Sequence, residues 1–223
     1  MQRFADILLS LIVIAILSPL FLVIILVLRL TGEGEVFYRQ QRVGLGGRLF
    51  GVFKFATMAK NSENIGTGLI TIKGDPRVFP VGRFLRKTKI NEFPQILNIL
   101  IGDMSFVGPR PQVKKHFDVY DDHVKKELIK IRPGLTGIGS IIFRDEESIL
   151  EKNKSLSYEE CYSKIIAPYK GDLELWYIKN NSFGLYLGLI FITAWVVLFS
   201  DSKIFLSVFK DLPQPPPEIG LQS

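Results

Sequence analysis

The stretch from Lys87 to Pro111, KTKINEFPQILNILIGDMSFVGPRP, carries most of the information about fold and chemistry. It opens with basic residues, passes through Asn91 and Glu92, and ends with Arg110 between two prolines. Asn is a favoured N-cap residue, Glu92 suits a first helical turn, and Pro94 is tolerated there. The pattern therefore predicts a helix that begins at Asn91 and buries the apolar residues that follow.

Two interpretations of this helix start remain open. The plain one is a helix cap beside a solvated basic face. The functional one is an anion site, because a helix N-terminus offers free backbone amides to phosphate. Four basic residues arrive just before that terminus: Arg83, Arg86, Lys87 and Lys89.

Two arginine loops favour the functional interpretation. Arg110 lies between prolines that stiffen the backbone, and arginine suits bidentate phosphate recognition. Arg132 precedes a proline and a glycine in the similar stretch IRPGLTGIGS. With Glu92 and Asp103 in the same region, these groups predict a site for a diphosphate and a hard divalent cation. Asp75 and Asp103 could equally be loop and cap residues.

The sequence on either side indicates regular structure. Residues 35–55 have aromatic and β-branched runs on both sides of GLGG, which predicts a β-hairpin with a glycine turn. A loop follows, with one short strand expected at Leu69 to Ile72, and a helix is expected over Arg83 to Ile90.

An apolar segment from Ile7 to Leu28 carries no charge and matches the length that a helix needs to cross hydrocarbon. Pro19 removes a backbone hydrogen bond near its centre, and Ser18 can bond back to Ile14, so a bend is expected. A kinked span and a re-entrant hairpin are both compatible with this pattern, and composition alone favours the plain span. The basic sequence that follows places the next domain in the cytoplasm in either case.

A second apolar stretch, Phe183 to Phe199, is at the lower length limit for spanning. Its glycines and aromatic residues predict a helix that lies in the membrane interface or packs on the domain. The last residues, Asp211 to Ser223, are rich in proline and predict an extended tail without a core of its own.

Composition limits the remaining possibilities. A chain of 223 residues with a net charge of +6 has room for one ordinary domain and an attachment, and its charge suits anionic partners. The single cysteine, Cys161, is expected in the core. His116 and His123 have no neighbouring cysteine, so they are expected at the surface rather than at a metal site.

The chain resembles the bacterial sugar transferase family, the monotopic polyprenyl-phosphate phosphoglycosyl transferases, over most of its length from Arg3 to about Leu198. The motifs that carry this resemblance are SP in the first apolar segment, FYRQQRVGLGGRLFGVFKFATM, DPRVFPVGRFLRKTKINEFPQILNILIGDMSFVGPRP, RPGLTG and LELWYIKNNS. They are long and occur in the family's order and spacing.

The resemblance implies an α+β fold in which a mostly helical cytoplasmic domain with a small β-hairpin is attached by a re-entrant membrane helix. The helix would be kinked at Ser18 and Pro19, which leaves Met1 and the domain on the cytoplasmic face of the bacterial inner membrane. The expected organisation is a membrane helix over residues 1–32, a catalytic domain over 33–200 and a proline-rich tail over 201–223.

The resemblance also implies a reaction. A sugar phosphate would pass from a UDP-sugar to polyprenyl (undecaprenyl) phosphate with Mg²⁺, giving a polyprenyl diphosphate sugar and UMP in the first step of lipid-linked polysaccharide synthesis. The family's nucleophilic aspartate falls on Asn91 and its acidic partner on Glu92. Asparagine departs from the pattern, because a neutral amide is not a competent nucleophile towards phosphorus. Ala56 is a second departure, since the family commonly has arginine there.

Three explanations for Asn91 follow: direct attack by polyprenyl phosphate, replacement of the nucleophile by Glu92, or an inactivating substitution. We expect a working transferase in which Glu92 binds Mg²⁺ and Asn91 orients a phosphate oxygen or a ligand. Lys54, Arg86 and Arg110 would bind phosphates and neutralise charge, and Arg132 would bind the donor or the lipid phosphate.

Two rival classes of protein remain. One is a catalytically silent, membrane-bound homologue that binds UDP-sugar and recruits downstream glycosyltransferases. The other, indicated by charge alone, is a membrane-tethered binder of nucleic acid or anionic lipid, which would need no Mg²⁺. The organised arginine loops count against nucleic acid, because diffuse electrostatic binding does not require them.

Overall fold

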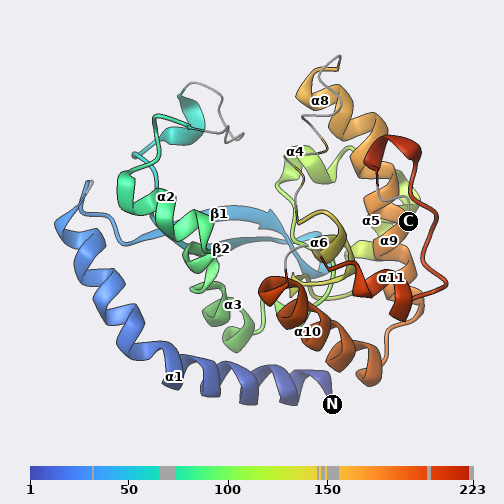
Figure 1. Ribbon diagram of the computed structural model, residues 1–223, viewed down its shortest axis with the longest axis horizontal. Helices are drawn as coiled ribbons and strands as arrows, with labels where there is room; N and C mark the ends of the chain where they lie inside the picture. Colours follow the sequence, from blue (N-terminus) through green and yellow to red (C-terminus); the bar gives the residue numbers. More distant parts are fainter. Residues whose placement is uncertain are drawn as a thin grey trace. The chain divides into compact units, whose positions relative to one another are not determined.

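The computed structural model describes residues 1–31, 33–65, 74–144, 146, 149, 156–199 and 202–220, and they are mostly helical (Figure 1). The chain divides into two compact units. The N-terminal unit comprises residues 5–40 and 51–102, and the C-terminal unit comprises residues 1–4, 41–50 and 103–223. The strand expected at Leu69 to Ile72 lies outside the described residues.

The chain forms one long helix, α1, many shorter helices and two small two-stranded sheets. A hairpin of β1 (Phe37–Val43) and β2 (Leu49–Phe55), with the turn η1 (Leu45–Gly47), runs through residues of both units. The other elements up to residue 102 are α1 (Gln2–Leu30), η2 (Ser62–Asn64), α2 (Pro80–Lys87), η3 (Ile90–Glu92) and α3 (Gln95–Ile101). Those that follow are β3 (Ser105–Val107), α4 (Lys114–Phe117), α5 (Asp122–Leu128), β4 (Gly134–Thr136), α6 (Ile138–Ile142), α8 (Tyr158–Cys161), η4 (Tyr162–Ile166), α9 (Ala167–Lys179), α10 (Phe183–Leu198), α11 (Ile204–Val208) and η5 (Pro217–Ile219).

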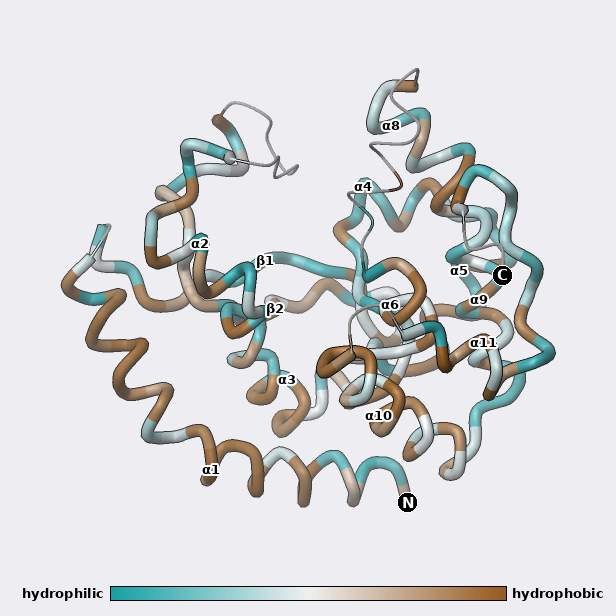
Figure 2. The backbone as a smooth tube through the Cα atoms, in the orientation of Figure 1, coloured by the Kyte–Doolittle hydropathy of each residue, from teal (hydrophilic) through white to brown (hydrophobic). Residues whose placement is uncertain are grey.

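Helix α1 is apolar over nearly all its length (Figure 2) and contains Pro19. Proline has no N–H, so the Ala15 carbonyl four residues earlier loses its helical partner. The Ser18 hydroxyl donates to this same Ala15 carbonyl at 3.0 Å, rather than to Ile14 as the sequence suggested. The ribbon of α1 changes direction part-way along its length (Figure 1).

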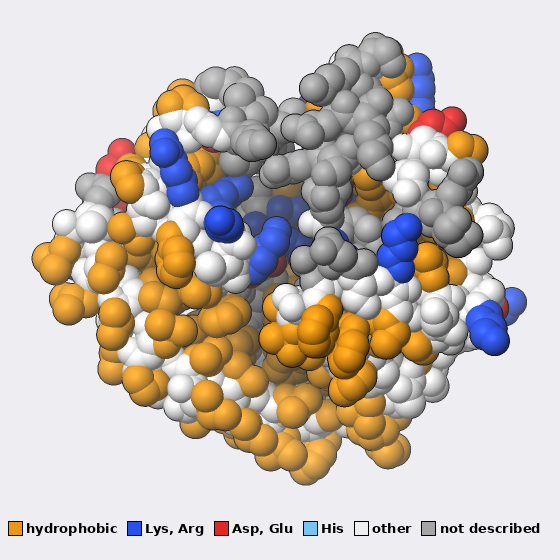
Figure 3. Space-filling model, viewed as in Figure 1, with side chains coloured by type: hydrophobic (Ala, Val, Ile, Leu, Met, Phe, Trp, Pro, Cys, Tyr) orange, Lys and Arg blue, Asp and Glu red, His pale blue; other side chains and the backbone are white. Residues whose placement is uncertain are grey.

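Helix α1 is the one helix in the described part of the chain that is long and apolar enough to cross a membrane. Only Asp6, Ser10, Ile24 and Leu28 of this helix are buried. Its hydrophobic side chains form a broad exposed surface (Figure 3). A water-soluble monomer rarely exposes so large an apolar patch, which is consistent with membrane association.

The last turns of α1 pack into the core of the N-terminal unit. Ile24 and Leu28 form a buried cluster with Phe55 of β2 and Leu85 of α2. Phe21 adds an edge-on contact with the Phe55 ring, at 5.5 Å between centroids. The apolar helix is therefore part of this unit's hydrophobic core.

The predicted hairpin is confirmed. Strands β1 and β2 pair, and the GLGG segment forms the turn between them. Gly46 and Gly47 have φ angles of 67° and 74°, a conformation that favours glycine over other residues. This explains why the turn contains glycine at these two positions.

The predicted helix boundaries around Asn91 are wrong. Helix α2 ends at Lys87, and Lys89 adopts φ +58°, so the helix does not continue to Ile90. Asn91 lies in the 3₁₀ turn η3 and is not an N-cap, because α3 begins only at Gln95.

The local hydrogen bonds explain this error. A cap at Asn91 would accept from the N–H groups two and three residues later. The N–H of Phe93 already donates to Ile90, at 3.1 Å, and Pro94 has no N–H. A helix N-terminus for binding an anion is therefore not present at Asn91.

Strands β3 and β4 of the C-terminal unit pair in parallel, with Ser105 opposite Gly134 and Val107 opposite Thr136. Helix α10 packs against both strands and against α6. Its buried side chains are Tyr186, Leu189, Ile192 and Val196, whereas Leu187, Phe191, Trp195 and Leu198 are exposed. The expected helix over residues 183–199 is thus packed on the domain by one face and presents an apolar second face.

The proline-rich tail lies against α9. The Trp176 indole N–H donates to the Asp211 carboxylate at 3.0 Å, and the Tyr169 hydroxyl donates to the Pro213 carbonyl at 3.1 Å. Leu212 and Ile219 are buried. Although it has no core of its own, this segment is integrated into the C-terminal unit.

Candidate functional site

The residues that the sequence singled out fall in both units. Lys54, Arg86, Asn91 and Glu92 belong to the N-terminal unit, and Arg110 and Arg132 belong to the C-terminal unit. Each group is described within its own unit.

The four residues of the N-terminal unit flank one apolar cluster. Phe55, Leu85 and Ile90 pack around the last turns of α1, and Phe93 contacts Phe21 with 6.4 Å between ring centroids. Each apolar residue adjoins one candidate residue in the sequence. The pairs are Phe55 with Lys54, Leu85 with Arg86, Ile90 with Asn91, and Phe93 with Glu92. The core thereby brings three separate elements, β2, α2 and η3, to the same end of α1.

Lys54 and Arg86 are half-buried and contact neutral acceptors. The Lys54 ammonium donates to the Gln40 side-chain oxygen at 3.3 Å, and the Arg86 guanidinium approaches the Met58 sulfur at 3.5 Å. Asn98 of α3 fixes β2 beside Lys54, because its amide accepts from the Phe53 N–H and donates to Gly51 O, each at 2.9 Å.

Asn91 is 7% exposed, and its Oδ1 atom is buried without a hydrogen-bond partner among the described residues. Such an unsatisfied oxygen costs about 1 to 3 kcal/mol. Glu92, next in sequence, is half-buried. A buried acceptor beside a carboxylate is the kind of environment that a bound cation or a donor group on a ligand would complete.

Asp75 has a structural role. It forms a buried ion pair with Arg77 at 2.6 Å, and hydrogen bonding to this carboxylate raises the pKa of Arg77. The Arg77 guanidinium also donates to the carbonyls of Ser62 and Ile65 at 2.6 and 2.7 Å. The pair therefore holds the loop around η2, and Asp75 is a loop residue rather than a metal ligand.

In the C-terminal unit, the backbone on both sides of Arg110 is held by bonds from three elements, α9, β4 and β1, and from Gln112 of the loop itself. The bonds are Tyr177 Oη to Val107 O at 3.3 Å, Gly108 N to Thr136 O at 2.9 Å, Gly134 N to Pro109 O at 2.8 Å, Gln112 Nε2 to Arg110 O at 3.2 Å, Arg42 Nη1 to Pro111 O at 3.1 Å and Val43 N to Gln112 O at 2.9 Å. This loop is a rigid support for the Arg110 side chain.

The Arg132 loop lies directly against the Arg110 loop, backbone to backbone. A Cβ atom at Gly108 would lie 2.5 Å from the Arg132 carbonyl, and one at Gly134 would lie 2.1 Å from the Gly108 nitrogen. Only glycine permits this approach. The structure thus brings the backbones of the two predicted arginine loops together, and the Arg132 side chain is exposed.

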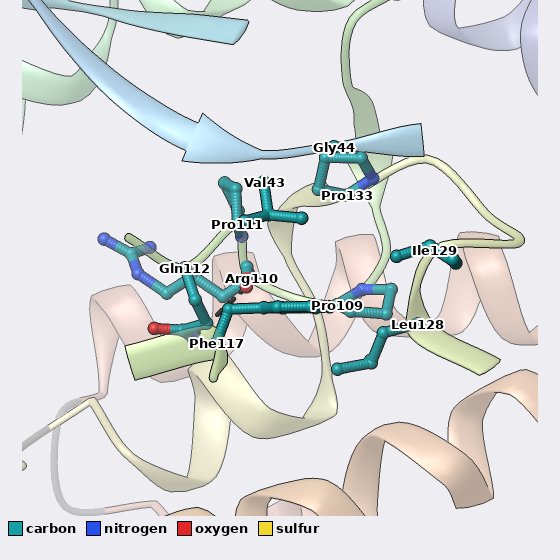
Figure 4. A pocket seen from close by; sticks show the side chains of 10 residues that line it. All are labelled: Val43, Gly44, Pro109, Arg110, Pro111, Gln112, Phe117, Leu128, Ile129 and Pro133. Carbon is teal, nitrogen blue, oxygen red and sulfur yellow. Dashed lines mark hydrogen bonds between the residues drawn. The ribbon is translucent and has the colours of Figure 1, made fainter. Parts of the chain in front are cut away.

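A cavity beneath the prolines is not a substrate site. Its volume is about 20 Å³, room for about one water molecule. In Figure 4 the Arg110 guanidinium points away from Leu128 and Pro133, which line the cavity. The cavity is therefore a packing gap under a loop that directs its arginine elsewhere.

Behind this loop lies a group of polar residues that the sequence patterns do not reveal. Glu174 of α9 is buried and accepts a hydrogen bond from the Arg110 backbone N–H; burial raises the pKa of its carboxyl to about 8. Lys170, also buried, pairs with Glu146 at 3.0 Å. His116, expected at the surface, is partly buried and stacks on Tyr162 at 4.3 Å, and burial lowers its pKa. Cys161 is in the core, as predicted.

Stiff arginine loops suit phosphate binding, and an exposed apolar helix suits contact with a membrane. Comparison with known proteins makes this more specific: the sequence profile of the family described as bacterial sugar transferase matches residues 1–200. The chain belongs to this family.

Several relatives are similar to the chain. A UDP-glucose:undecaprenyl-phosphate glucose-1-phosphate transferase of Klebsiella pneumoniae is 35% identical over 198 residues, 87% of this chain and 39% of the relative. An undecaprenyl-phosphate galactose phosphotransferase of Salmonella typhimurium is 34% identical, covering 90% of this chain and 41% of the relative. The exopolysaccharide production protein ExoY of Sinorhizobium fredii is 35% identical over 66% of this chain and 71% of its own length. The chain thus spans about two fifths of the first two relatives.

Proposed function

We propose that this protein is a phosphoglycosyl transferase that moves a sugar phosphate from a UDP-sugar to polyprenyl phosphate. The products would be a polyprenyl diphosphate sugar and UMP, at the start of lipid-linked polysaccharide synthesis. The observation that carries this proposal is the family match across residues 1–200, which includes every candidate residue. The names of relatives, which state undecaprenyl phosphate and sugar phosphate transfer, support the substrate class.

The proposed topology is a re-entrant helix. Pro19 interrupts the hydrogen bonds of α1, and Ser18 compensates by donating to Ala15. A bend at this pair would return the chain to the side it entered from, with Met1 and the domain both on the cytoplasmic face of the inner membrane. The exposed apolar side chains of α1 (Figure 3) support contact of this helix with lipid.

The basic residues would act on phosphate. Lys54 and Arg86, whose described contacts include neutral acceptors, would bind phosphate oxygens as charge moves during transfer. Arg110, on its rigid loop, would bind the donor diphosphate in a bidentate manner, and Arg132 would bind donor or lipid phosphate.

Mg²⁺ fits the residues of η3. Glu92 supplies a carboxylate and Asn91 an unsatisfied amide oxygen, both of which are hard ligands. No cluster of three or more His, Cys, Asp or Glu side chains occurs among the described residues, so the other ligands would be substrate phosphates and water. When bound, the cation would supply charge neutralisation at the diphosphate.

Direct transfer is the mechanism we favour. An oxygen of polyprenyl phosphate would attack the β-phosphorus of the UDP-sugar and form a new P–O bond. The bond from that phosphorus to the bridging oxygen would break, and UMP would leave with the electron pair. Asn91 would orient a phosphate oxygen or a ligand, a role that positioning and electrostatics allow without a protein nucleophile. Glu92 as a replacement nucleophile is the competing route.

The test is Mg²⁺-dependent UMP release from a panel of UDP-sugars and polyprenyl phosphate. We expect the protein to turn over, Glu92→Gln to lose about 100-fold or more in rate, and Asn91→Asp to be no faster. Asp118→Asn, which removes an exposed carboxylate paired with Lys114, is the matched control and should behave like the parent. A phosphosugar adduct on Glu92 after incubation with donor alone, detected by mass spectrometry, would refute direct transfer.

A second candidate function is supported by Asn91 itself. A protein without the nucleophile could bind UDP-sugar, release no UMP and serve as a scaffold for downstream glycosyltransferases. Turnover by Asn91→Asp alone, together with tight UDP-sugar binding by the parent, would support this alternative and exclude a working transferase.

A further inference from the structure

The buried face of α9 carries an acid that the proposed chemistry does not use. Glu174 is 2% exposed. Its carboxyl group accepts a hydrogen bond from the backbone N–H of Arg110, and its Oε2 atom is buried without a partner among the described residues. Burial of an acid is costly unless the group is hydrogen-bonded, paired or neutral.

The space for this carboxyl group is provided by a glycine. A Cβ atom at Gly139 of α6 would lie only 2.4 Å from Glu174 Oε1. Any other residue at this position would displace the acid from the loop. The contact between Glu174 and the loop therefore depends on residues from two elements, α6 and α9.

The bond to Arg110 is unusual because of the prolines around it. Pro109 and Pro111 have no N–H, so the N–H of Arg110 is the single backbone donor of this tripeptide. A buried donor without an acceptor would cost stability or force the loop to turn outwards. Glu174 supplies the acceptor.

Glu174 accepts the hydrogen bond from the Arg110 N–H mainly in its neutral, protonated form. Burial raises the pKa of Glu174 to about 8, and the nearby Lys170 ammonium opposes this shift only in part. Lys170 itself pairs with Glu146. A neutral carboxyl oxygen accepts an N–H bond as a carboxamide oxygen does, so glutamine should replace Glu174 in this role.

We propose that Glu174 is a positioning residue for Arg110: by fixing the Arg110 N–H, it sets the direction in which the guanidinium leaves the loop towards a diphosphate. The inference rests on the proposed function only in that Arg110 binds the diphosphate. Other bonds to the loop, such as Gly134 N to Pro109 O at 2.8 Å, do not involve Glu174. Replacing Glu174 should therefore change the direction of the Arg110 side chain without unfolding the unit.

The experiment measures binding of UDP, which carries the diphosphate without a sugar, to the full chain in detergent by isothermal titration calorimetry. The affinity for UDP can be measured whether or not the protein catalyses transfer. Glu174→Met keeps the length of the side chain but removes the acceptor, and we expect about tenfold weaker binding, about 1.4 kcal/mol. Glu174→Gln should bind UDP within about twofold of the parent, less than about 0.5 kcal/mol.

A double-mutant cycle separates positioning from general loss of structure. In the Arg110→Ala background, Glu174→Met should cause no further loss, because the group that it positions is absent. Trp176→Phe is the matched control on the same helix: it removes the bond to Asp211, so it should lower the melting temperature and leave UDP affinity unchanged.

The outcomes are distinguishable. Equal losses from Glu174→Met with and without Arg110 would mean a purely structural effect and would overturn the inference. Unchanged affinity in Glu174→Met, with weakened affinity in Arg110→Ala, would overturn it while leaving the proposed function intact. Unchanged affinity in Arg110→Ala would remove the diphosphate role of this loop, and the inference with it.

Discussion

At the scale of single residues, Glu174 makes stability depend on pH. Its pKa is raised from 4.5 to about 8, so the folded protein holds a proton that the unfolded chain has released across this interval. The free energy of unfolding must therefore fall as pH rises through the interval, and become level above pH 8. We expect Glu174→Gln, which cannot titrate, to lose less stability than the parent between about pH 7 and about pH 8.

Thermal unfolding followed by circular dichroism in detergent measures this difference. Lys170 and Tyr120 are the ionisable groups coupled to Glu174. The pKa of Tyr120 is raised well above 10, so it stays protonated across that pH range. Parallel pH profiles for the parent and Glu174→Gln would show that the carboxyl is not the titrating group.

Single residues also show where sequence reasoning fails. Asn91 is a favoured N-cap residue by type, but no backbone N–H is available to donate to its side-chain oxygen. Pro94 lacks an N–H, and the N–H of Phe93 already donates to the Ile90 carbonyl. Glu174 follows Lys170 by four residues, a spacing that is typical of an exposed ion pair on a helix. Both are buried here, and the sequence does not reveal this because the burial arises from loops distant in the chain.

At the scale of elements, α1 has a structural role in addition to its membrane role. Phe21 lies against Phe55 and Phe93, which are the sequence neighbours of Lys54 and Glu92. Phe21→Ala should lower the stability of the N-terminal unit by about 2 kcal/mol, since the ring is only partly buried. UMP release should fall with it, because the supports of β2 and η3 loosen. Thermal unfolding and UMP release measured on the same preparation check both effects.

The adjacent residue provides the control. Leu22 is 68% exposed on the same turn of α1, so Leu22→Ala removes a similar apolar volume without touching this cluster. Its melting temperature should match that of the parent. If the two variants are equally stable, α1 is attached to the core more loosely than these ring contacts indicate.

The tail after α11 provides a second prediction at this scale. It covers α9 through bonds from Trp176 and Tyr169, and it buries Leu212 and Ile219. A chain that ends at Val208 should therefore lose about 4 kcal/mol of stability from the exposed apolar side chains. Chemical denaturation in detergent measures the change.

Gln214→Ala, at an exposed position of the same tail, is the control, and it should leave the midpoint of denaturation unchanged. This substitution would contradict the prediction if it shifted the midpoint as much as the truncation. No change after truncation at Val208 would mean that these contacts contribute nothing to α9.

The sequence predicts best those elements whose conformation is determined by residues close together in the chain. Glycines with positive φ form the turn of the β1–β2 hairpin, and continuous apolar sequence produces α1 and α10. The parallel pairing of β3 with β4 was not predicted, because each strand is only three residues long. Glycine contacts such as that of Gly108 with Gly134 determine this pairing, and they join segments that are distant in sequence.

At the scale of the whole molecule, the main question is the side of the membrane on which the chain begins. The sequence predicts an apolar helix that contains proline, and the structure contains this helix with Ser18 bonded to Ala15 beside Pro19. Its length of 29 residues is enough for a straight span if the bend were removed. A bend at Ser18 and Pro19 is therefore the feature on which the proposed re-entrant topology depends.

If the proposed re-entrant topology holds, changing Ser18 and Pro19 to alanine together should convert the helix into a span, because the backbone hydrogen bond to Ala15 is restored. The reporter is a Gln2→Cys substitution in a Cys161→Ala background, which leaves one thiol near the N-terminus. A maleimide that does not cross membranes is applied to spheroplasts and to lysed cells. The parent topology should be labelled only after lysis, and the Ser18, Pro19 double variant should also be labelled in intact spheroplasts.

A control thiol tests the position of the domain. Lys126→Cys, on helix α5 of the C-terminal unit, should be labelled only after lysis in both topologies, because the proposed topology and its straight alternative both keep the basic domain in the cytoplasm. Labelling of Gln2→Cys in intact spheroplasts that carry the parent Ser18 and Pro19 would show that α1 already crosses the membrane. In that case the acceptor lipid would have to approach the N-terminal unit beside a plain anchor, and the proline would have no role in topology.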